Sequence, residues 1–318
     1  MSQLDDDFQR IEQEINKNLQ SSVPLIAQVS RYIIRSGGKR LRPLLMVLAA
    51  RLLHYHGDDK YALSIVFEYL HAATLLHDDV VDNAELRRGQ PSANTVWGNA
   101  AVVLVGDFLL ATSFLLSVLS GNLKILRVLS ETTTTMAEGE VLQLINSDNL
   151  EVTEEDYLEV ISRKTAILIS AACQVGAILG NAAEDQEDAV RSFGLNLGMA
   201  FQLRDDVLDY SGTEEEVGKP VGKDLQEGKI TLPLIHTLAS SSNEDRQRLI
   251  ELITADEIEP QTFREVQTII QRYLGLDYTN QLANRYIATA KDKLATFPPS
   301  PARDSLLEIA DYVVTRRV

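Results

Sequence analysis

The chain has 318 residues, of which 45% are hydrophobic and 24% are charged, and its formal net charge is −16. This composition is typical of a globular protein with a sizeable core, and the length allows one large domain or two ordinary ones. The acidic balance argues against a nucleic-acid partner, because binding a phosphate backbone requires a basic face, so any anion site must be built locally from clustered Lys and Arg or from bound metal.

Cysteine content and the start of the chain bear on the cellular compartment. Cys173 is the only cysteine, which excludes an intrachain disulfide and a Cys-based metal cluster. The start, MSQLDDDFQR, is acidic and lacks the basic and apolar regions of a secretory signal. We therefore expect a cytoplasmic protein.

Helix signals dominate the sequence. No proline lies between Pro91 and Pro220, and no Asn-Gly or Asp-Gly dipeptide marks a hairpin anywhere. We predict about ten or more helices in one all-α bundle, a single domain spanning residues 1–318. Loops are expected at 36–39, 83–90, 211–223 and 297–301, from their Gly, Pro and polar content.

The first element with chemistry is the segment GGKRLRP at 37–43. Its two glycines let the backbone approach a ligand closely, and its three cations within four residues can surround a diphosphate. Pro43 opens an apolar run and so marks a helix N-terminus, which itself favours anions. The alternative is a capping loop whose basic side chains face solvent.

The segment 66–82 is apolar round most of its circumference, which predicts a helix buried on nearly all sides. It ends in an Asp-Asp-x-x-Asp motif, Asp78 to Asp82. Positions i and i+4 share a helix face, so Asp78 and Asp82 point the same way and repel each other unless a cation lies between them. Hard oxygen ligands, with other positions left to water and phosphate, suit Mg²⁺. The alternative is a solvated helix end.

Basic side chains follow and precede this motif. Arg87 and Arg88 come after one short loop, and paired arginines suit bidentate phosphate binding. Such a pair is usually a surface feature, but next to an aspartate cluster it predicts a phosphate clamp. His71 lies two turns before Asp78 on the same helix face, and both a core histidine and a ligand role remain open for it.

The stretches 100–105 and 108–119 are apolar but are broken by polar residues such as Asp107 and Ser113. A membrane span needs about 20 consecutive, predominantly apolar residues. We therefore interpret these stretches as buried core helices and expect no transmembrane segment.

Two further helices are predicted at 157–179 and 187–210, from apolar positions at three- and four-residue spacing. Thr153 with Asp156 makes a capping-box-like start for the first, and Asp185 is a candidate cap for the second. Lys164 lies in the largely apolar first helix, where a buried ammonium group needs an anionic partner.

The second helix ends in a second Asp-Asp-x-x-Asp motif, Asp205 to Asp209. Because each of the two motifs follows an apolar helical segment, a pair of solvated helix ends is the weaker interpretation. Lys219 and Lys229 lie in the Gly-rich stretch that follows and are weak signals by themselves.

These stretches together resemble the trans-prenyltransferase family of polyprenyl diphosphate synthases, and over most of the chain the bacterial octaprenyl and solanesyl diphosphate synthases. The resemblance rests on GGKRLRP, LLHDDVVDNAELRRGQPSAN, LVGDFLL, AEGEVLQL, RKTA, FQLRDDVLDY and GKITLPLI, in family order from Gly37 to Ile235. After about residue 240 the chain adds helices but no motif.

The resemblance implies an isoprenoid synthase-type bundle around a deep central cavity, normally a homodimer. It implies that Asp78, Asp82 and Asp205 hold two or three Mg²⁺ ions, and that the catalytic residues are Asp78, Asp79, Asp82, Arg87, Lys164, Asp205 and Asp206. The allylic diphosphate would be held by Arg87, Lys164, Thr165, Gln202, Lys219 and Lys229. Isopentenyl diphosphate would be held by Lys39, Arg42, His71 and Arg88.

The reaction so implied lengthens an allylic diphosphate, farnesyl diphosphate in the first place, by successive head-to-tail condensation with isopentenyl diphosphate. Metal ions and the basic side chains stabilise the departing diphosphate, and apolar helix walls keep water from the allylic cation. No side chain stands out as the base, so the diphosphate accepts the proton.

Product length depends on the residues one and two turns before Asp78, which are Ala73 and Thr74, with Leu70 and Val66 further up. In the family, bulky aromatics at the first two positions stop growth early. Small residues here predict an octaprenyl to decaprenyl product, such as a quinone side chain. Candidates for the pocket floor are Phe114, Ser117 and Leu129.

Alternatives remain at this stage. A geranylgeranyl diphosphate synthase would need a bulky residue a little deeper in the tunnel. A catalytically silent partner subunit would lack one or both acidic motifs, and a terpene cyclase would use a different second metal motif and would not need GGKRLRP. A purely structural helical protein is the remaining class.

Overall fold

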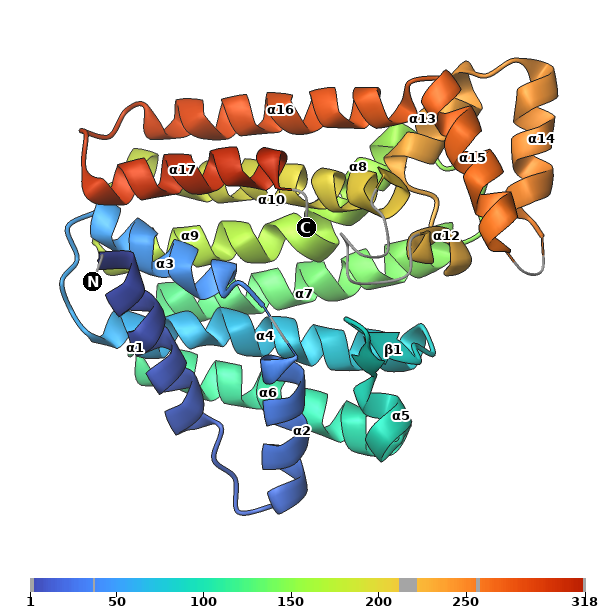
Figure 1. The fold of residues 1–318 in the computed structure, drawn as a ribbon. Coiled ribbons are helices and arrows are strands. Elements are labelled where there is room, and N and C mark those ends of the chain that lie inside the picture. Colours follow the sequence, from blue (N-terminus) through green and yellow to red (C-terminus); the bar gives the residue numbers. More distant parts are fainter. Residues whose placement is uncertain (1–2, 37, 212–221, 256–257, 317–318) are drawn as a thin grey trace. The chain divides into compact units, whose positions relative to one another are not determined.

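The structure, a computed structural model, describes residues 3–36, 38–211, 222–255 and 258–316 (Figure 1). Most of these residues are helical, in more than ten helices, which confirms the predicted all-α class. The chain divides into two compact units. The first unit comprises Met1–Thr132, Leu168–Arg191 and Phe297–Leu306, and the second comprises Thr133–Ile167, Ser192–Thr296 and Leu307–Val318.

The first unit contains the whole of α1 (Gln3–Asn18), α2 (Pro24–Arg35), α3 (Leu41–Leu52), α4 (Asp59–Val81), α5 (Ala93–Trp97) and α6 (Asn99–Leu119). The second contains α8 (Glu154–Ile161), a π-helical turn η1 (Ser162–Ala166), α12 (Lys223–Gln226), α13 (Leu232–Ser240), α14 (Asn243–Ile253), α15 (Pro260–Arg272) and α16 (Gly275–Leu294). Residues of α7 (Leu123–Asn146), α9 (Ile167–Leu179), α10 (Glu184–Ser211) and α17 (Pro301–Thr315) belong to both units.

The first unit is built around α4, which packs against α1, α2, α3, α5 and α6 (Figure 1). Side chains on most sides of α4 are buried, among them Val66, Leu70, Ala73 and Leu76. A helix that is apolar all round needs neighbours on every side. The prediction of a buried helix at 66–82 is therefore confirmed.

The two helices predicted in the middle of the chain are also confirmed. The run from α8 through η1 to α9 covers 154–179, and α10 extends over Glu184–Ser211. Thr153 and Asp156 form the expected capping box, each side chain bonding the other residue's backbone N–H. Asp185 lies inside the first turn of α10 rather than at its cap, a position where a negative charge still suits the helix dipole.

The segment 83–90, expected to be a loop, contains a short antiparallel pair, β1 (Leu86–Arg87) and β2 (Gln90–Pro91). The turn between the strands has positive φ at both central residues, 52° at Arg88 and 73° at Gly89. Two-residue hairpin turns of this kind favour Asn-Gly or Asp-Gly. An arginine in the first position is why the sequence carried no hairpin signal.

In the second unit, α13, α14, α15 and α16 pack together round one apolar core. Phe263 of α15 stacks on Tyr210 at the end of α10, with ring centroids 5.9 Å apart. Leu234, Val266 and Ile270 are fully buried beside them. This core supports the C-terminal end of α10, where the second acidic motif lies.

The prediction that 100–119 is a buried core segment is wrong for one side of α6. Leu104, Leu115 and Leu119 are 67%, 60% and 74% exposed in the single chain. Among the described helices, α6 alone is long and apolar enough to cross a membrane by length and composition, and 33% of its most apolar window is buried. Periodicity alone missed this exposure, because α6 is apolar both where it faces α4 and where it faces outward.

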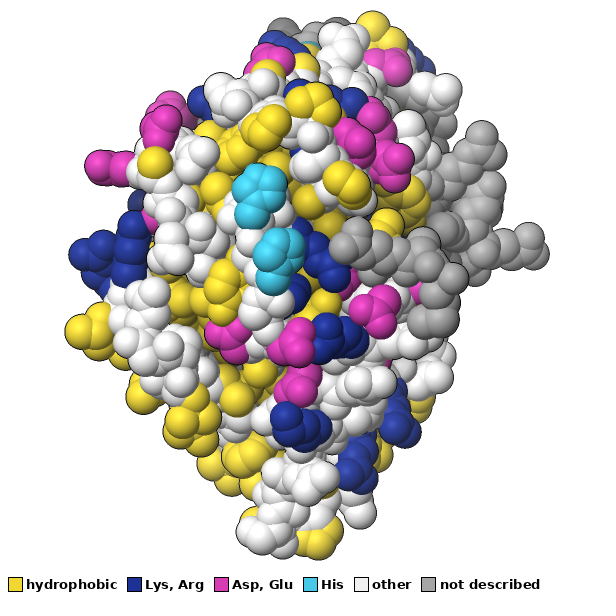
Figure 2. Space-filling model, turned by 90° about the vertical axis from the view of Figure 1, so that its left-hand side faces the viewer, with side chains coloured by type: hydrophobic (Ala, Val, Ile, Leu, Met, Phe, Trp, Pro, Cys, Tyr) yellow, Lys and Arg dark blue, Asp and Glu magenta, His cyan; other side chains and the backbone are white. Residues whose placement is uncertain are grey.

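Surface charge is mixed on the face of the molecule drawn in Figure 2. Acidic and basic side chains alternate there with hydrophobic ones, and no broad basic area is visible among the described residues of that face.

Candidate active site

The first acidic motif lies at the C-terminal end of α4, which ends at Val81 with Asp82 as its C-cap. Asp78 and Asp82 are half-buried, and Asp79 is fully buried. A residue one position along a helix is turned by about 100° from its neighbour, so Asp79 faces away from the pair at i and i+4. The motif therefore divides into two partly exposed carboxylates and one internal one.

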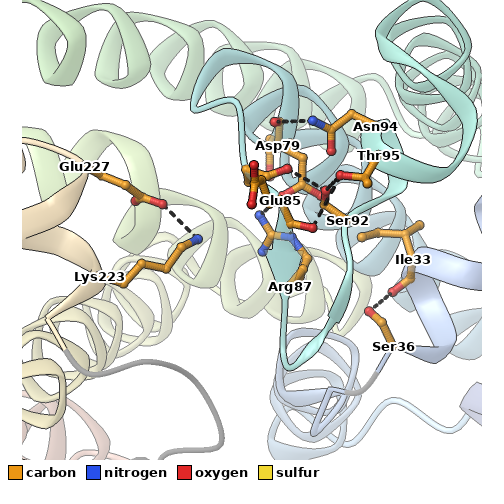
Figure 3. A network of polar contacts seen from close by, with 12 residues as sticks. Ile33, Ser36, Asp79, Glu85, Arg87, Ser92, Asn94, Thr95, Lys223 and Glu227 are labelled. Carbon is orange, nitrogen blue, oxygen red and sulfur yellow. Dashed lines mark hydrogen bonds and ion pairs between the residues drawn. The ribbon is translucent and has the colours of Figure 1, made fainter. Parts of the chain in front are cut away.

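Asp79 is engaged by Arg87, as Figure 3 shows. Oδ1 of Asp79 accepts a hydrogen bond from Nε of Arg87 at 2.8 Å and lies 2.6 Å from Nη2 in the ion pair. The backbone carbonyl of Asp79 accepts from the side-chain amide of Asn94, which ties α5 to α4. Oδ2 of Asp79 is buried without a hydrogen-bond partner among the described residues. In this structure Arg87 thus orders the loop after the motif and is not turned outward beside Arg88.

His71 lies among arginines. Burial lowers the pKa of His71 well below its usual value, and the positive charges of Arg42, Arg88, Arg87 and Arg40 lower it further. The imidazole is therefore neutral at neutral pH. All five residues belong to the first unit, and two of the four guanidinium groups, those of Arg87 and Arg40, are paired with carboxylates.

The glycine-rich loop brings backbone close to this cluster. A Cβ on Gly38 would lie 3.3 Å from Nη1 of Arg40 and 3.8 Å from Nη1 of Arg88. A side chain at this position would therefore be in tight contact with Arg40 and in ordinary contact with Arg88. Gly38 and Lys39 beside it are both exposed.

Arg40, one of the three cations of GGKRLRP, serves a different purpose from the one predicted. Its guanidinium pairs with Glu68 on α4 and with Glu12 on α1, both at 2.6 Å, and donates to the carbonyl of Ile34 at 2.9 Å. Each of its three nitrogen atoms thus donates to a protein acceptor. Arg40 therefore holds the loop against two helices.

Arg40→Met is expected to lower the free energy of unfolding by about 3 kcal/mol, because it leaves the buried carboxylate of Glu68 without its cation. Urea unfolding followed by circular dichroism measures this. Arg248→Met removes an exposed pair with Glu265 and should cost under about 1 kcal/mol. Equal losses in the two variants would contradict a structural role for Arg40.

The second acidic motif lies in the last turns of α10, where Asp206 and Asp209 are buried and Asp205 is partly exposed. Arg316, near the C-terminus, pairs with Asp205 at 2.7 Å. Arg316 also donates to the carbonyl of Phe201 at 3.0 Å and lies 3.9 Å above the ring of that residue. A cation is thus held at Asp205.

Asp206 is the centre of a buried hydrogen-bond chain. Its Oδ2 accepts from the hydroxyl of Tyr157 at 2.5 Å, and its Oδ1 accepts from the amide of Gln202 at 2.8 Å. The hydroxyl of Thr165 donates to Oε1 of Gln202 at 3.0 Å. Burial and the nearby charge of Asp224 raise the pKa of Asp206, and the bonds from Tyr157 and Gln202 partly offset this.

These side chains line a pocket of about 150 Å³ within the second unit. Its basic members are Lys164, which pairs with Glu140, and Lys229, which pairs with Glu227, both at 2.6 Å. Lys223 pairs with the other oxygen of Glu227 (Figure 3). The ammonium groups of Lys164 and Lys229 and the amide of Gln202 therefore line one pocket, and each is bonded to a carboxylate.

Lys164 and Thr165 lie in η1, the π-helical turn between α8 and α9. Such turns insert an extra residue into a helix and are frequent at functional sites. The turn packs closely on α10. The two backbones are so near that a Cβ built on Gly198 would lie 2.5 Å from Cα of Ala166. Close approach of the two helices places Thr165 within reach of Gln202.

The residues predicted to limit product length lie on α4. Val66, Leu70 and Ala73 are buried, and Thr74 is partly buried with its hydroxyl bonded to the carbonyl of His71. The facing helix is α6, whose Ser113 donates to the carbonyl of Val66 at 3.4 Å. Of the three candidate floor residues, Ser117 and Leu129 are buried and Phe114 is partly buried.

Some site features lie beyond the prediction or the described residues. Lys219 falls among 212–221, outside the described part of the chain. Tyr157 and Asp224 line the pocket with the predicted residues but were not singled out from the sequence. For Tyr157 a signal existed, since it precedes Lys164 by seven residues, two turns on the same face.

The chain matches a family model described as polyprenyl synthetase over residues 23–270. Octaprenyl diphosphate synthases of Haemophilus influenzae and Escherichia coli are 42% and 41% identical to it, each over 98% of this chain and over 94% and 96% of their own lengths. A polyprenyl synthase from Caulobacter crescentus, solved with calcium and isoprenyl diphosphate, matches with TM-score 0.93 and 42% identity over 99% of this chain and 96% of that one. A decaprenyl diphosphate synthase from Rhodobacter capsulatus matches with TM-score 0.92 and 41% identity over 98% and 96%.

Proposed function

Because the chain belongs to the polyprenyl synthetase family, and is thus a prenyltransferase that makes long polyprenyl diphosphates, we propose that it lengthens farnesyl diphosphate with isopentenyl diphosphate to an all-trans octaprenyl to decaprenyl product for a quinone side chain. The observation that carries the proposal is the cluster of arginines round His71, on the helix that ends in Asp78 and Asp82. The arginines come from the start of α3 and from the β1–β2 hairpin, and His71 shares α4 with the two carboxylates proposed to bind metal.

Asp78, Asp82 and Asp205 would hold Mg²⁺ in this proposal, two or three ions in each site. Among the described residues no three or more acidic, His or Cys side chains converge on one ready-made metal centre. The donor set still fits, because Mg²⁺ is bound by one or two carboxylates together with water and substrate phosphate. The guanidinium held at Asp205 supports this, since that carboxylate already attracts a cation, and Arg316 would give way to the metal. When bound, the metal stabilises the negative charge of the departing diphosphate.

The basic side chains bind the two substrates. Lys164 and Lys229 would exchange their glutamate partners for phosphate oxygens of the allylic substrate, beside Thr165 and Gln202. Lys39, Arg42, His71 and Arg88 would hold isopentenyl diphosphate. Lys219 remains a proposed contact to the allylic diphosphate, as does Arg87 once it reaches beyond Asp79.

The condensation needs no reactant besides the two diphosphates. The allylic C–O bond breaks and its electron pair leaves with the diphosphate. The isopentenyl double bond supplies the electrons of the new C–C bond, and loss of a proton to the diphosphate forms the new allylic double bond. Buried apolar side chains of α4 would keep water away from the cation.

We also propose that the two compact units belong to one synthase domain, since the family match runs through both. The protein would act in the cytoplasm without a membrane-spanning segment. A second copy of the chain would cover the exposed apolar side of α6 in a homodimer, because a large exposed apolar patch marks an interaction surface.

Light scattering is expected to give twice the 35.3 kDa mass of one chain. Leu104 and Leu115 lie on one side of α6, so Leu104→Glu/Leu115→Glu should shift the protein to single chains. Leu274→Glu, at an exposed leucine of the second unit, should leave the mass unchanged. A dimer that survives the double substitution would exclude α6 as the interface.

The function is tested by incubating the purified protein with Mg²⁺, labelled isopentenyl diphosphate and farnesyl diphosphate, and then sizing the lipid. Products of octaprenyl to decaprenyl length support the proposal. Geranylgeranyl diphosphate as the end product would favour the short-chain alternative, and no product would overturn the proposed activity.

A further inference from the structure

We propose that Tyr157 is a positioning residue for the allylic diphosphate, which it serves by holding Asp206 so that Asp206 fixes the amide orientation of Gln202. The proposal rests on the proposed function, in which Gln202 contacts that diphosphate. In this proposal Asp206 orients Gln202, the residue proposed to contact the substrate.

The series of hydrogen bonds that orients Gln202 starts at the phenol of Tyr157. Its pKa is raised well above its usual value by burial and by the charge of Asp206, so it stays protonated and is a donor. It lies 2.5 Å from Oδ2 of Asp206, and both side chains are buried. The phenol therefore selects one rotamer of the carboxylate and leaves Oδ1 directed toward Gln202.

The amide of Gln202 is held from both ends. Oε1 accepts from Thr165, while Nε2 donates to Asp206. The reversed amide would place a carbonyl oxygen against a carboxylate oxygen, which is repulsive. The bonds thus fix the amide and leave one N–H of Nε2 for a ligand in the pocket that Lys164 and Lys229 also line.

This arrangement matters because the pocket must bind an anion. A freely rotating amide would present its carbonyl oxygen part of the time, and that oxygen repels phosphate. Asp224 lines the same pocket and its negative charge acts on Asp206. Without the phenol, Asp206 is expected to turn away from Asp224 and release Gln202.

The decisive variant is Tyr157→Phe, which removes only the hydroxyl. Calorimetry at saturating Mg²⁺ would measure the binding of a non-reactive allylic analogue, farnesyl thiodiphosphate, and separately of isopentenyl diphosphate. We expect the analogue to bind about 5- to 10-fold more weakly, in line with one lost hydrogen bond in a buried network, and isopentenyl diphosphate to bind unchanged. Equal weakening of both ligands, or of neither, would overturn the proposal.

Tyr278→Phe is the matched control. Its hydroxyl donates to Glu154 at 2.7 Å, on the same helix as Tyr157 but away from the pocket. This variant should bind both ligands as the unchanged protein does. If it weakens the analogue as much as Tyr157→Phe, loss of α8 stability is the cause and the proposal fails.

Gln202→Leu distinguishes a failure of the positioning role from a failure of the proposed substrate contact. Gln202→Leu alone should weaken the analogue, and adding Tyr157→Phe should weaken it no further, because the phenol acts through the amide. If Gln202→Leu has no effect, the assignment of Gln202 to the allylic diphosphate is wrong. If it weakens binding of the analogue while Tyr157→Phe does not, only the positioning role is wrong.

Should Tyr157→Phe fail to fold, Asp206→Asn breaks the same series of hydrogen bonds. It is expected to weaken binding of the analogue alone, whereas unchanged binding would overturn the proposal.

Discussion

Replacing Asp78 with alanine is expected to lower kcat about a thousandfold or more at saturating substrate, with no loss of folded structure. Metal ions stabilise a departing phosphoryl charge by several kcal/mol, and about 4 kcal/mol corresponds to three powers of ten in rate. Asp78 is half-buried at the end of α4, so the stability of the fold does not depend on it as it does on Asp79. Steady-state kinetics over a range of Mg²⁺ concentrations provides the measurement.

The control for Asp78→Ala is Asp188→Ala, which removes an exposed carboxylate paired with Arg191 on α10. Its kcat and its dependence on Mg²⁺ should equal those of the unchanged protein. Circular dichroism of both variants shows whether they remain folded. A folded Asp78→Ala protein with full turnover would end the proposal that this carboxylate holds a metal required for catalysis.

Ala73→Phe is expected to shorten the product from the octaprenyl to decaprenyl range to geranylgeranyl diphosphate or less. Ala73 is buried on α4, and the five residues from it to Asp78 span about 7.5 Å of helix. A benzyl group there would fill the space that the growing chain must pass. Chromatography of the dephosphorylated lipids measures the length.

Ala73→Phe also adds volume to a packed region, and such overpacking costs about 1–3 kcal/mol, so its melting temperature must be compared with the unchanged protein. Ala288→Phe makes the same chemical change at an exposed position of α16 and should leave the product length unchanged. If Ala73→Phe made the same product as its parent, the pocket would lie elsewhere.

Comparison of the two aspartate motifs shows what local geometry predicts. The pairing of Asp78 with Asp82 on one helix face follows from helical spacing, and the structure places both as partly exposed. The same spacing turns Asp79 and Asp206 away from the pair, and both are buried and bonded to protein donors. In the second motif the spacing is not sufficient, because Asp209 shares a face with partly exposed Asp205 and is nevertheless buried.

The basic residues show where local reasoning ends. Arg40 and Arg42 lie two positions apart in one motif, yet Arg40 is taken by Glu12 and Glu68. Arg87 bonds Asp79, whereas its neighbour Arg88 lies close to Gly38. Each outcome depends on which acceptor another helix brings near, and no property of the arginine itself determines it.

The sequence by itself determined the helical class, the helices that bear both acidic motifs, and the family, because periodicity and motif spacing are properties of short segments. Only the tertiary structure decided the partners of the charged side chains, the exposed side of α6 and the chain from Tyr157 to Thr165. Tyr157 and Asp206 are 49 residues apart, and Arg316 and Asp205 are 111 apart. Such contacts form because packing of the helices carries distant segments together, and that depends on the whole chain.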